Sequence, residues 1–199
     1  MKLHLLGDYN LYNALAAIGV GLHHGCSLQT IKEGLESTVV PGRFERVDKG
    51  QDFAVVVDYA HTPDGLENLL AAARKITKGR LICVFGCGGD RDSGKRPKMG
   101  KISTAIADFS VITSDNPRTE DPGRIISDIV SGLPDGANYV KIVNRKAAIK
   151  HAIKIAEPGD LVAIAGKGHE PYQEINGQRF HFDDREIASA SLELLKLSK

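Results

Sequence analysis

The sequence predicts an α/β fold in which a mostly parallel sheet is covered by helices on both faces. Short apolar runs alternate with longer stretches whose apolar residues recur at helical spacing, and this alternation is typical of a parallel sheet. The apolar runs are nearly continuous, as in residues 161–164, which is the pattern of strands buried on both faces. Loops rich in Gly, Asp, Arg and His follow these runs, where open α/β sheets bind ligands.

The order of the elements follows from this pattern. A first helix is predicted over residues 10–24 with Asn10 as its N-cap, and Ser27 is predicted to cap a second helix. Pro41 and Gly42 then break the pattern and mark a hinge. The strands predicted after the hinge are residues 53–57, 80–85, 110–113, 139–142 and 161–165, with an edge strand at 178–182. The helices predicted after the hinge are residues 66–76, 99–107, 123–132, 145–155 and 183–197.

Composition narrows the functional class. The 199 residues carry a net charge of +1, which gives no electrostatic reason to expect a nucleic-acid or membrane partner. No apolar run is long enough for a transmembrane helix, and the first residues turn polar too soon for a signal peptide. The 3 cysteines are too scattered for a disulfide framework and have no neighbouring metal ligands. We therefore expect a cytoplasmic protein that holds no metal in this chain.

The first glycine-rich loop, residues 86–94, invites two interpretations that its charged residues contradict. A dinucleotide-binding fingerprint would need a third glycine where Arg91 stands. A P-loop would need Ser or Thr after Gly94 and Lys95, but Arg96 follows, so the magnesium-binding hydroxyl is missing. The loop is better interpreted as a backbone nest with cationic side chains for an anionic group, Arg91 foremost. For Lys95 and Arg96, a solvated basic turn stays a reasonable interpretation.

A rigid polar turn, Asp115-Asn116-Pro117-Arg118, follows the strand predicted at residues 110–113. Pro117 fixes its own φ and restricts Asn116 to an extended conformation. Arg118 then presents a planar guanidinium group that suits a carboxylate. Taken alone, a turn of this kind is more often structural than functional.

Two further strand ends carry polar residues. Asp58 follows the first strand after the hinge. Either it serves a ligand, by accepting hydrogen bonds from ribose hydroxyls or by supporting a metal, or it closes the turn before the next helix, which Thr62 or Asp64 caps. The residues themselves favour neither interpretation over the other. In the second glycine-rich loop, residues 166–170, the glycines allow a ligand to approach the backbone, and Glu170 offers an acceptor for an ammonium group. His169 is assigned no catalytic role.

Together these motifs resemble the Mur ligases, and most closely the branch of that family that adds meso-diaminopimelate. Six motifs carry the resemblance, in order through nearly the whole chain: Asn10–Ala17, Pro41–Glu45, Asp58–Pro63, Gly88–Asp92, Asp115–Arg118 and Gly166–Glu170. Members of this family have a UDP-binding domain, a central ATPase domain with a P-loop and a Rossmann-like C-terminal domain. The resemblance implies that residues 1–45 end the central domain and that residues 46–199 form the C-terminal, amino-acid-binding domain.

The resemblance also implies that the sequence is a piece of a longer ligase, inactive alone, with Met1 as an artificial start. Nothing in it matches the UDP-binding domain or the P-loop of the family. Leu3, Leu5 and the first helix would pack against the N-terminal and central domains that are missing, and would otherwise leave an exposed apolar patch.

The chemistry implied by the resemblance is ATP-dependent amide-bond formation in peptidoglycan synthesis. ATP would phosphorylate the γ-carboxylate of UDP-N-acetylmuramoyl-L-alanyl-D-glutamate, and an amine of meso-diaminopimelate would then displace the phosphate. ATP and Mg²⁺ would be bound mainly by the absent central domain, and no residue here would act as a nucleophile. The residues implied to bind meso-diaminopimelate are Arg91, Asp115, Asn116, Pro117, Arg118, Gly166 and Glu170. Those implied to contact ATP are Asn13, Arg43, Asp58 and His61.

Charge complementarity agrees with this amino acid. Its distal end carries a carboxylate, which suits Arg91 and Arg118, and an ammonium, which suits Glu170 and a backbone carbonyl near Gly166. Lysine lacks the distal carboxylate and would leave both guanidinium groups unpaired, so the site should reject it. Within the resemblance, Arg118 is the marker for diaminopimelate over lysine.

Two alternatives stay open. One is another ligase of the same superfamily, of the folylpolyglutamate or cyanophycin synthetase type, against which the turn at residues 115–118 argues. The other is a stand-alone module that binds an amino acid or a nucleotide without catalysis, and that would need no further domains.

Overall fold

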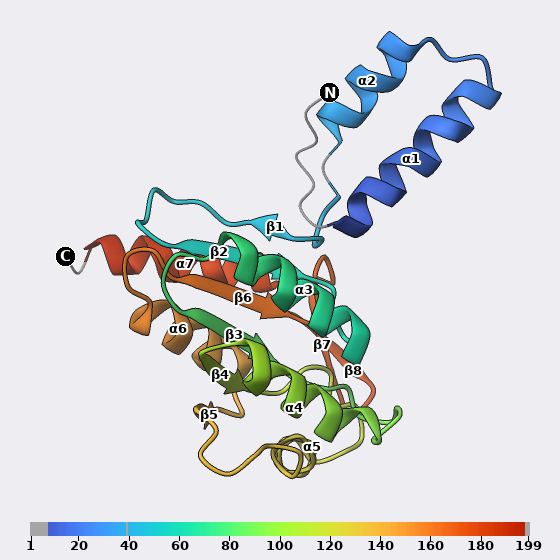
Figure 1. Ribbon diagram of the computed structural model, residues 1–199. Helices are drawn as coiled ribbons and strands as arrows, with labels where there is room; N and C mark the ends of the chain where they lie inside the picture. Colours follow the sequence, from blue (N-terminus) through green and yellow to red (C-terminus); the bar gives the residue numbers. More distant parts are fainter. Residues whose placement is uncertain (1–7, 39, 198–199) are drawn as a thin grey trace.

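A six-stranded sheet forms the centre of the molecule (Figure 1). The computed structural model describes residues 8–38 and 40–197, and within them the strand order is β1-β2-β6-β3-β4-β5. All neighbouring strands pair in parallel except β1 with β2. The strands are β1 (Glu45–Arg46), β2 (Ala54–Asp58), β3 (Leu81–Phe85), β4 (Phe109–Ile112), β5 (Tyr139–Lys141) and β6 (Leu161–Ala165). The predicted mostly parallel α/β sheet is therefore confirmed.

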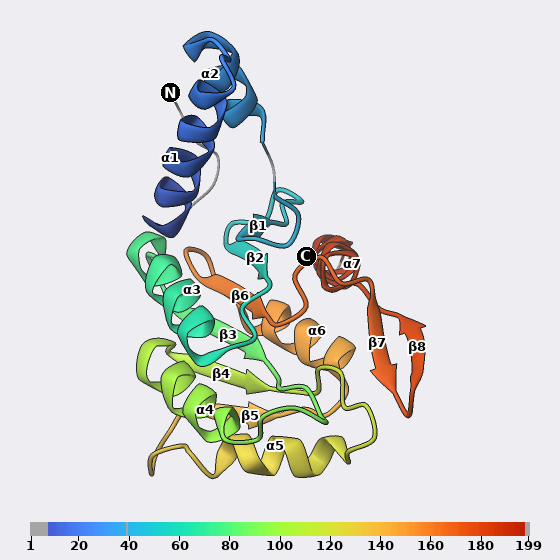
Figure 2. The same cartoon turned by 90° about the vertical axis from the view of Figure 1, so that its right-hand side faces the viewer.

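Helices cover both faces of this sheet (Figure 2). Those on one face are α3 (Pro63–Ile76), α4 (Lys95–Ile106) and α5 (Pro122–Val130), and those on the other are α6 (Arg145–Ile155) and α7 (Asp184–Leu197). In β3, Leu81, Cys83 and Phe85 pack into the first layer, whereas Ile82 and Val84 pack into the second. Every residue of β3 and β6 is buried, which explains why their sequences are apolar without alternation.

The strand order brings the polar loops together. β6 lies between β2 and β3, and β4 lies on the other side of β3. Because these four strands are parallel, the loops that follow them leave the sheet at the same edge. The two glycine-rich loops and the turn at residues 115–118 are therefore neighbours at that edge.

Most predicted elements are found within a few residues of their expected bounds. α6 and β6 coincide with the predictions, and Ser27 caps α2 (Leu28–Ser37) by accepting a hydrogen bond from the Thr30 N–H at 3.1 Å. α4 begins at Lys95, a full turn before the predicted start at Met99.

One prediction about local structure is wrong: Asn10 is not an N-cap, because α1 (Asp8–His23) already includes it. The strand predicted at residues 178–182 is found as β8 (Gln178–His181), but it pairs antiparallel with β7 (Tyr172–Ile175), a strand that was not predicted, in a hairpin separate from the main sheet. The tip of this hairpin is Asn176-Gly177, and both residues have a positive φ. An Asn-Gly dipeptide is a strong hairpin signal, but a prediction from apolar residues alone does not use it.

The first two helices form a pair that projects from the sheet (Figure 1). In α1, Leu11, Tyr12, Leu15 and Val20 are each more than half exposed, as expected for an apolar surface left uncovered. Leu3, Leu5 and Met1 lie outside the described residues. Among the helices that are described, none combines the length and the hydropathy needed to cross a bilayer.

Candidate functional site

An open cavity of about 660 Å³ lies at the edge of the sheet where the loops meet. All the residues implied to bind the amino acid line it except Pro117: Arg91, Asp115, Asn116, Arg118, Gly166 and Glu170. Pro117 is buried and lines a groove on the other side of the turn instead. Of the residues implied to contact ATP, His61 lines the cavity.

The turn at residues 115–118 is bound to the β7–β8 hairpin. The Arg118 N–H donates to the Glu174 carbonyl at 3.0 Å, and the Asn176 N–H donates to the Arg118 carbonyl at 2.7 Å. These two bonds add a short β-bridge between the turn and β7. Arg118 has a φ of 51°, which is costly for a residue other than glycine, so the hairpin holds the backbone in a conformation that it would otherwise avoid.

Two arginines flank Gly88 in the cavity. A Cβ atom at Gly88 would stand 3.0 Å from Arg118 Nη1 and 4.0 Å from Arg91 Cγ. The Arg118 guanidinium is held in place, because Nη1 donates to the Gly89 carbonyl at 2.7 Å and Nε lies 3.5 Å from a Glu174 carboxylate oxygen. Arg91 is exposed and donates to the carbonyl of the residue before it at 2.9 Å. One cation is thus fixed, and the other is free to adjust to a ligand.

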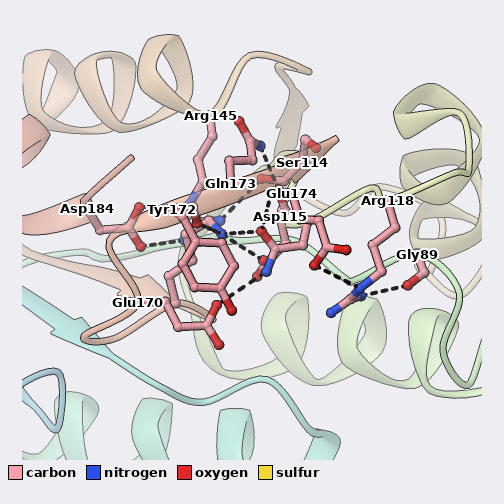
Figure 3. A network of polar contacts seen from close by, with 12 residues as sticks. Gly89, Ser114, Asp115, Arg118, Arg145, Glu170, Tyr172, Gln173, Glu174 and Asp184 are labelled. Carbon is pink, nitrogen blue, oxygen red and sulfur yellow. Dashed lines mark hydrogen bonds and ion pairs between the residues drawn. The ribbon is translucent and has the colours of Figure 1, made fainter. Parts of the chain in front are cut away.

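Glu170 supplies a negative charge to the same cavity. Its two carboxylate oxygens accept hydrogen bonds from the Asn116 side-chain amide at 3.2 Å and from the Tyr59 hydroxyl at 3.3 Å. Figure 3 shows Glu170 and Arg118 on opposite sides of Asp115. A ligand lying across the cavity would therefore meet cations at one end and an anion at the other.

Lys167 is a buried cation behind this site, and the sequence had suggested no role for it. Its ammonium donates to the Asn116 side-chain oxygen at 2.7 Å and to the Tyr172 carbonyl at 2.8 Å, and lies 3.3 Å from an Asp115 carboxylate oxygen. Burial alone would raise the pKa of the Asp115 carboxyl, but Lys167 and Arg145 outweigh burial and hold that pKa below its ordinary value. Asp115 therefore stays ionised next to the cavity.

Gly166 fits tightly against this buried charge. Its φ is 122°, and a Cβ atom there would stand 2.5 Å from an Asp115 carboxylate oxygen. Only glycine combines that backbone conformation with so close an approach.

A second buried ion pair lies beneath the turn and the second glycine-rich loop (Figure 3). Arg145 donates to both carboxylate oxygens of Asp184, at 2.8 and 2.7 Å, and neither side chain is exposed at all. Arg145 also donates to the Ala165 carbonyl at 2.9 Å and to the Ser114 carbonyl at 3.4 Å. The first residue of α6 thus fastens the end of β6 and the segment after β4 to the start of α7.

The interpretation of Arg96 as part of a solvated basic turn is wrong. Only 2% of its side chain is exposed, and it donates to both oxygens of Glu120, at 2.9 and 2.8 Å, and to Asp128 at 2.8 Å. The early start of α4 directs Arg96 toward α5 rather than toward solvent. Lys95, in contrast, lines the cavity and donates to the His61 carbonyl at 2.8 Å.

Two of the residues implied to contact ATP gather around one aromatic ring. The Arg43 guanidinium lies 4.9 Å from the centroid of the Tyr59 ring, and the His61 ring lies 4.6 Å from the same centroid. This exposed cluster offers flat surfaces and a positive charge beside the cavity. Asn13 lies on α1, where its side-chain amide donates to that of Asn10 at 3.2 Å.

Asp58 is engaged by the backbone. Its carboxylate accepts hydrogen bonds from the Phe44 N–H at 2.7 Å and from the Ala60 N–H at 2.8 Å. Burial raises its pKa, although these two bonds and Arg43 act against that increase. This geometry favours the turn-closing interpretation, and it ties the hinge segment to the end of β2.

The described residues contain no cluster of three or more His, Cys, Asp or Glu side chains that would fit a metal ion. Cys83 and Cys87 are buried, and burial raises the pKa of each thiol to about 12, so neither is a ready nucleophile. The cavity is suited to recognising and placing a charged ligand.

Sequence reasoning missed Lys167, Arg145 and Glu174, all of which shape the site. Lys167 stands between two glycines after an apolar strand, and Arg145 opens a helix after Asn144, positions at which cations are ordinarily solvated. The Asn176-Gly177 dipeptide would have pointed to the hairpin and hence to Glu174. No local signal distinguishes the two buried cations from exposed ones.

Comparison with known proteins identifies the family to which the chain is similar. Residues 42–168 match the Mur ligase family, in the part described as the glutamate ligase domain. A UDP-N-acetylmuramoyl-L-alanyl-D-glutamate–2,6-diaminopimelate ligase of Nostoc sp. is 58% identical over 191 residues, which are 94% of this chain and 38% of that protein. A solved structure of a ligase with the same name is similar at a TM-score of 0.77 and 40% identity, over 98% of this chain and 40% of the other.

The fold extends to a more distant ligase as well. A folylpolyglutamate synthase of Mycobacterium tuberculosis, solved with ADP and AMPPCP, has a TM-score of 0.67 at 21% identity, over 96% of this chain and 41% of the other. At that identity the likeness concerns the fold alone. The chain spans about two fifths of the length of the curated relatives that it matches.

Proposed function

This chain belongs to the Mur ligase family, and we propose that it supplies the amino-acid site of an ATP-dependent ligase acting in peptidoglycan synthesis. The proposed reaction adds meso-diaminopimelate to UDP-N-acetylmuramoyl-L-alanyl-D-glutamate, as the names of the similar ligases state for those proteins. The observation that carries the proposal is the charge pattern of the cavity: Arg118 and Glu170 lie on opposite sides of Asp115 (Figure 3), and Arg91 lines the same cavity next to Gly88, as Arg118 does.

Each charged group has a defined part in this proposal. The distal carboxylate of the amino acid pairs with Arg118, which is already held in position, and with Arg91, which closes onto it. The distal ammonium pairs with Glu170 beside Gly166. Asp115 and Pro117 act indirectly: the first is neutralised by Lys167, and the second stiffens the turn.

The reaction itself requires activation of a carboxylate. In this proposal, a phosphoryl group from ATP converts the γ-carboxylate of the D-glutamate residue into an acyl phosphate. The lone pair of a diaminopimelate amine then attacks the acyl carbon, phosphate leaves with the electrons of the broken C–O bond, and the amine loses its proton. This chain contributes by positioning the amine, so its effect is one of proximity and orientation.

The remaining parts of the function are also proposals. Residues 1–45 would belong to a central ATPase domain and residues 46–199 to the amino-acid domain. The exposed apolar surface of α1 would contact the rest of such a ligase. Arg43, Asp58, His61 and Asn13 would lie on the nucleotide side, and Mg²⁺ would be held outside this chain. Nucleotide-linked substrates place the reaction in the cytoplasm.

A calorimetric titration with meso-diaminopimelate, with L-lysine as the matched ligand, tests the proposal. We expect lysine to bind about 10- to 100-fold more weakly, because it leaves the two guanidinium groups without a carboxylate. Arg118→Met removes the guanidinium and should abolish most of the preference for diaminopimelate over lysine.

Equal binding of both ligands would contradict the charge-recognition argument. Binding of diaminopimelate without any ligase activity in the protein encoded by the complete reading frame would favour a binding module instead. If neither diaminopimelate nor lysine binds, that result would argue against an amino-acid site that is preformed in this chain.

A further inference from the structure

In the function proposed so far, the ammonium group of Lys167 only neutralises Asp115, although it is fully buried at the centre of the site. It does not line the cavity, so it does not contact the ligand directly. It is surrounded by an Asn116 side-chain oxygen, the Tyr172 carbonyl and the Asp115 carboxylate, at 2.7, 2.8 and 3.3 Å. Three acceptors, two on the turn at residues 115–118 and one at Tyr172, match the three hydrogens of an ammonium group.

The contact with Asn116 fixes the direction of an amide. An Asn side chain can be turned by 180° with little change in shape, so its neighbours decide which end faces which way. Here the oxygen accepts from Lys167 at 2.7 Å and from the Glu174 N–H at 3.0 Å. Both donors lie on the oxygen side, and the NH₂ group is left to donate to Glu170 at 3.2 Å.

The direction of this amide matters for Glu170. If the amide were turned, its oxygen would face the Glu170 carboxylate and repel it, and its NH₂ group would face the Lys167 ammonium. In the observed direction, Asn116 and the Tyr59 hydroxyl each bind one oxygen of Glu170 and hold the carboxylate in the cavity.

We propose that Lys167 is a positioning residue that orients the Asn116 amide and thereby places the Glu170 carboxylate to receive the ammonium group of the amino acid. This inference rests on the proposed function for the identity of the ligand. The geometry also explains why the position needs a cation rather than another donor: Asp115 is buried beside it, and a neutral side chain would leave that carboxylate without its nearest counter-charge.

Two dicarboxylates, one with amines and one without, test the proposal in Lys167→Met, which keeps the length of the side chain and removes the ammonium. We expect the dissociation constant for meso-diaminopimelate to rise about 5- to 10-fold, because one hydrogen bond in a charged chain is lost. The dissociation constant for pimelate, which has both carboxylates but no amine to pair with Glu170, should change less than about twofold. Lys101→Met, which removes an exposed lysine on α4, controls for the loss of one positive charge.

A general disturbance of the site would weaken both ligands equally, and that result would overturn the proposal. Unchanged affinity for both ligands would overturn it as well. Heteronuclear NMR of the Asn116 side-chain amide separates this proposal from the proposed function. If the unmutated protein fails to bind diaminopimelate, that result argues against an amino-acid site preformed in this chain, whereas an Asn116 amide signal that does not respond to Lys167→Met contradicts the positioning role itself.

If Lys167→Met does not fold, NMR of the unmutated protein still tests the positioning role. A buried ammonium held by three acceptors should give a slowly exchanging side-chain signal with a nuclear Overhauser contact to Asn116. A rapidly exchanging, solvent-like lysine signal would overturn the proposal.

Discussion

The two glycine-rich loops of this protein follow neighbouring strands and contact the same turn, yet they use their cations in opposite ways. The loop after β3 (residues 86–94) directs Arg91 into the open cavity. The loop after β6 (residues 166–170) buries Lys167 behind the turn, where it binds Asn116 and stays out of the cavity. The two loops look alike in sequence, but one directs its cation into the cavity and the other buries its cation against the turn.

The ion pairs beneath the two loops also differ, in how far solvent reaches the acidic partners. Under the first, Arg96 pairs with Glu120 and Asp128, whose side chains are 29% and 41% exposed. Under the second, Arg145 pairs with Asp184, and both side chains are fully buried. Solvent can replace a lost partner in the first case but not in the second. The second loop is therefore built for rigidity, and the first tolerates adjustment.

Removal of the buried arginines should give the largest difference between the loops. Arg145→Met leaves the Asp184 carboxylate buried and unpaired, so we expect the free energy of unfolding to fall by about 3–5 kcal/mol. Arg96→Met leaves acids that water can reach, and we expect a loss of about 1–2 kcal/mol. Urea unfolding of the two variants measures both values. Equal losses would mean that the exposure of the acidic partners does not set the cost.

A glycine-to-alanine substitution in each loop should give the second largest difference in stability between the loops. Gly166→Ala combines a φ of 122° with a clash against the Asp115 carboxylate, and we expect a loss of about 2–3 kcal/mol. Gly94→Ala is the matched control in the first loop, since its φ of −63° suits alanine and the Cβ atom would meet only the exposed Asp92 side chain. Its effect on thermal unfolding should stay within about 0.5 kcal/mol. A small effect at Gly166 would show that Asp115 can move.

The smallest effect on stability is expected at Arg91, where the effect on binding should be clear. Arg91→Ala removes an exposed side chain, so the free energy of unfolding should change by no more than about 0.5 kcal/mol. The affinity for meso-diaminopimelate should fall about tenfold, because one partner of its carboxylate is lost. Calorimetry and urea unfolding on the same preparation test both statements. A large loss of stability without loss of affinity would assign Arg91 to the fold rather than to the ligand.

The sequence predicted the elements whose signals are local. The strand at residues 161–165 is an apolar run between turn residues, and the helix at residues 145–155 has its own N-cap in Asn144, so both are found as predicted. The β7–β8 hairpin escaped because its strands are mostly exposed and polar, and the apolar pattern gives no signal there. The start of α4 was placed too late because its first turn is basic rather than apolar.

For this protein, the sequence by itself determined the α/β order, the family resemblance and the set of polar residues at the strand ends. Only the tertiary structure decided which cations line the cavity and which are buried behind it. Lys167 meets Asn116 across 51 residues of chain, and Arg145 meets Asp184 across 39. Secondary structure depends on neighbours a few residues away, whereas a charge can be buried only where the fold brings a distant partner to it.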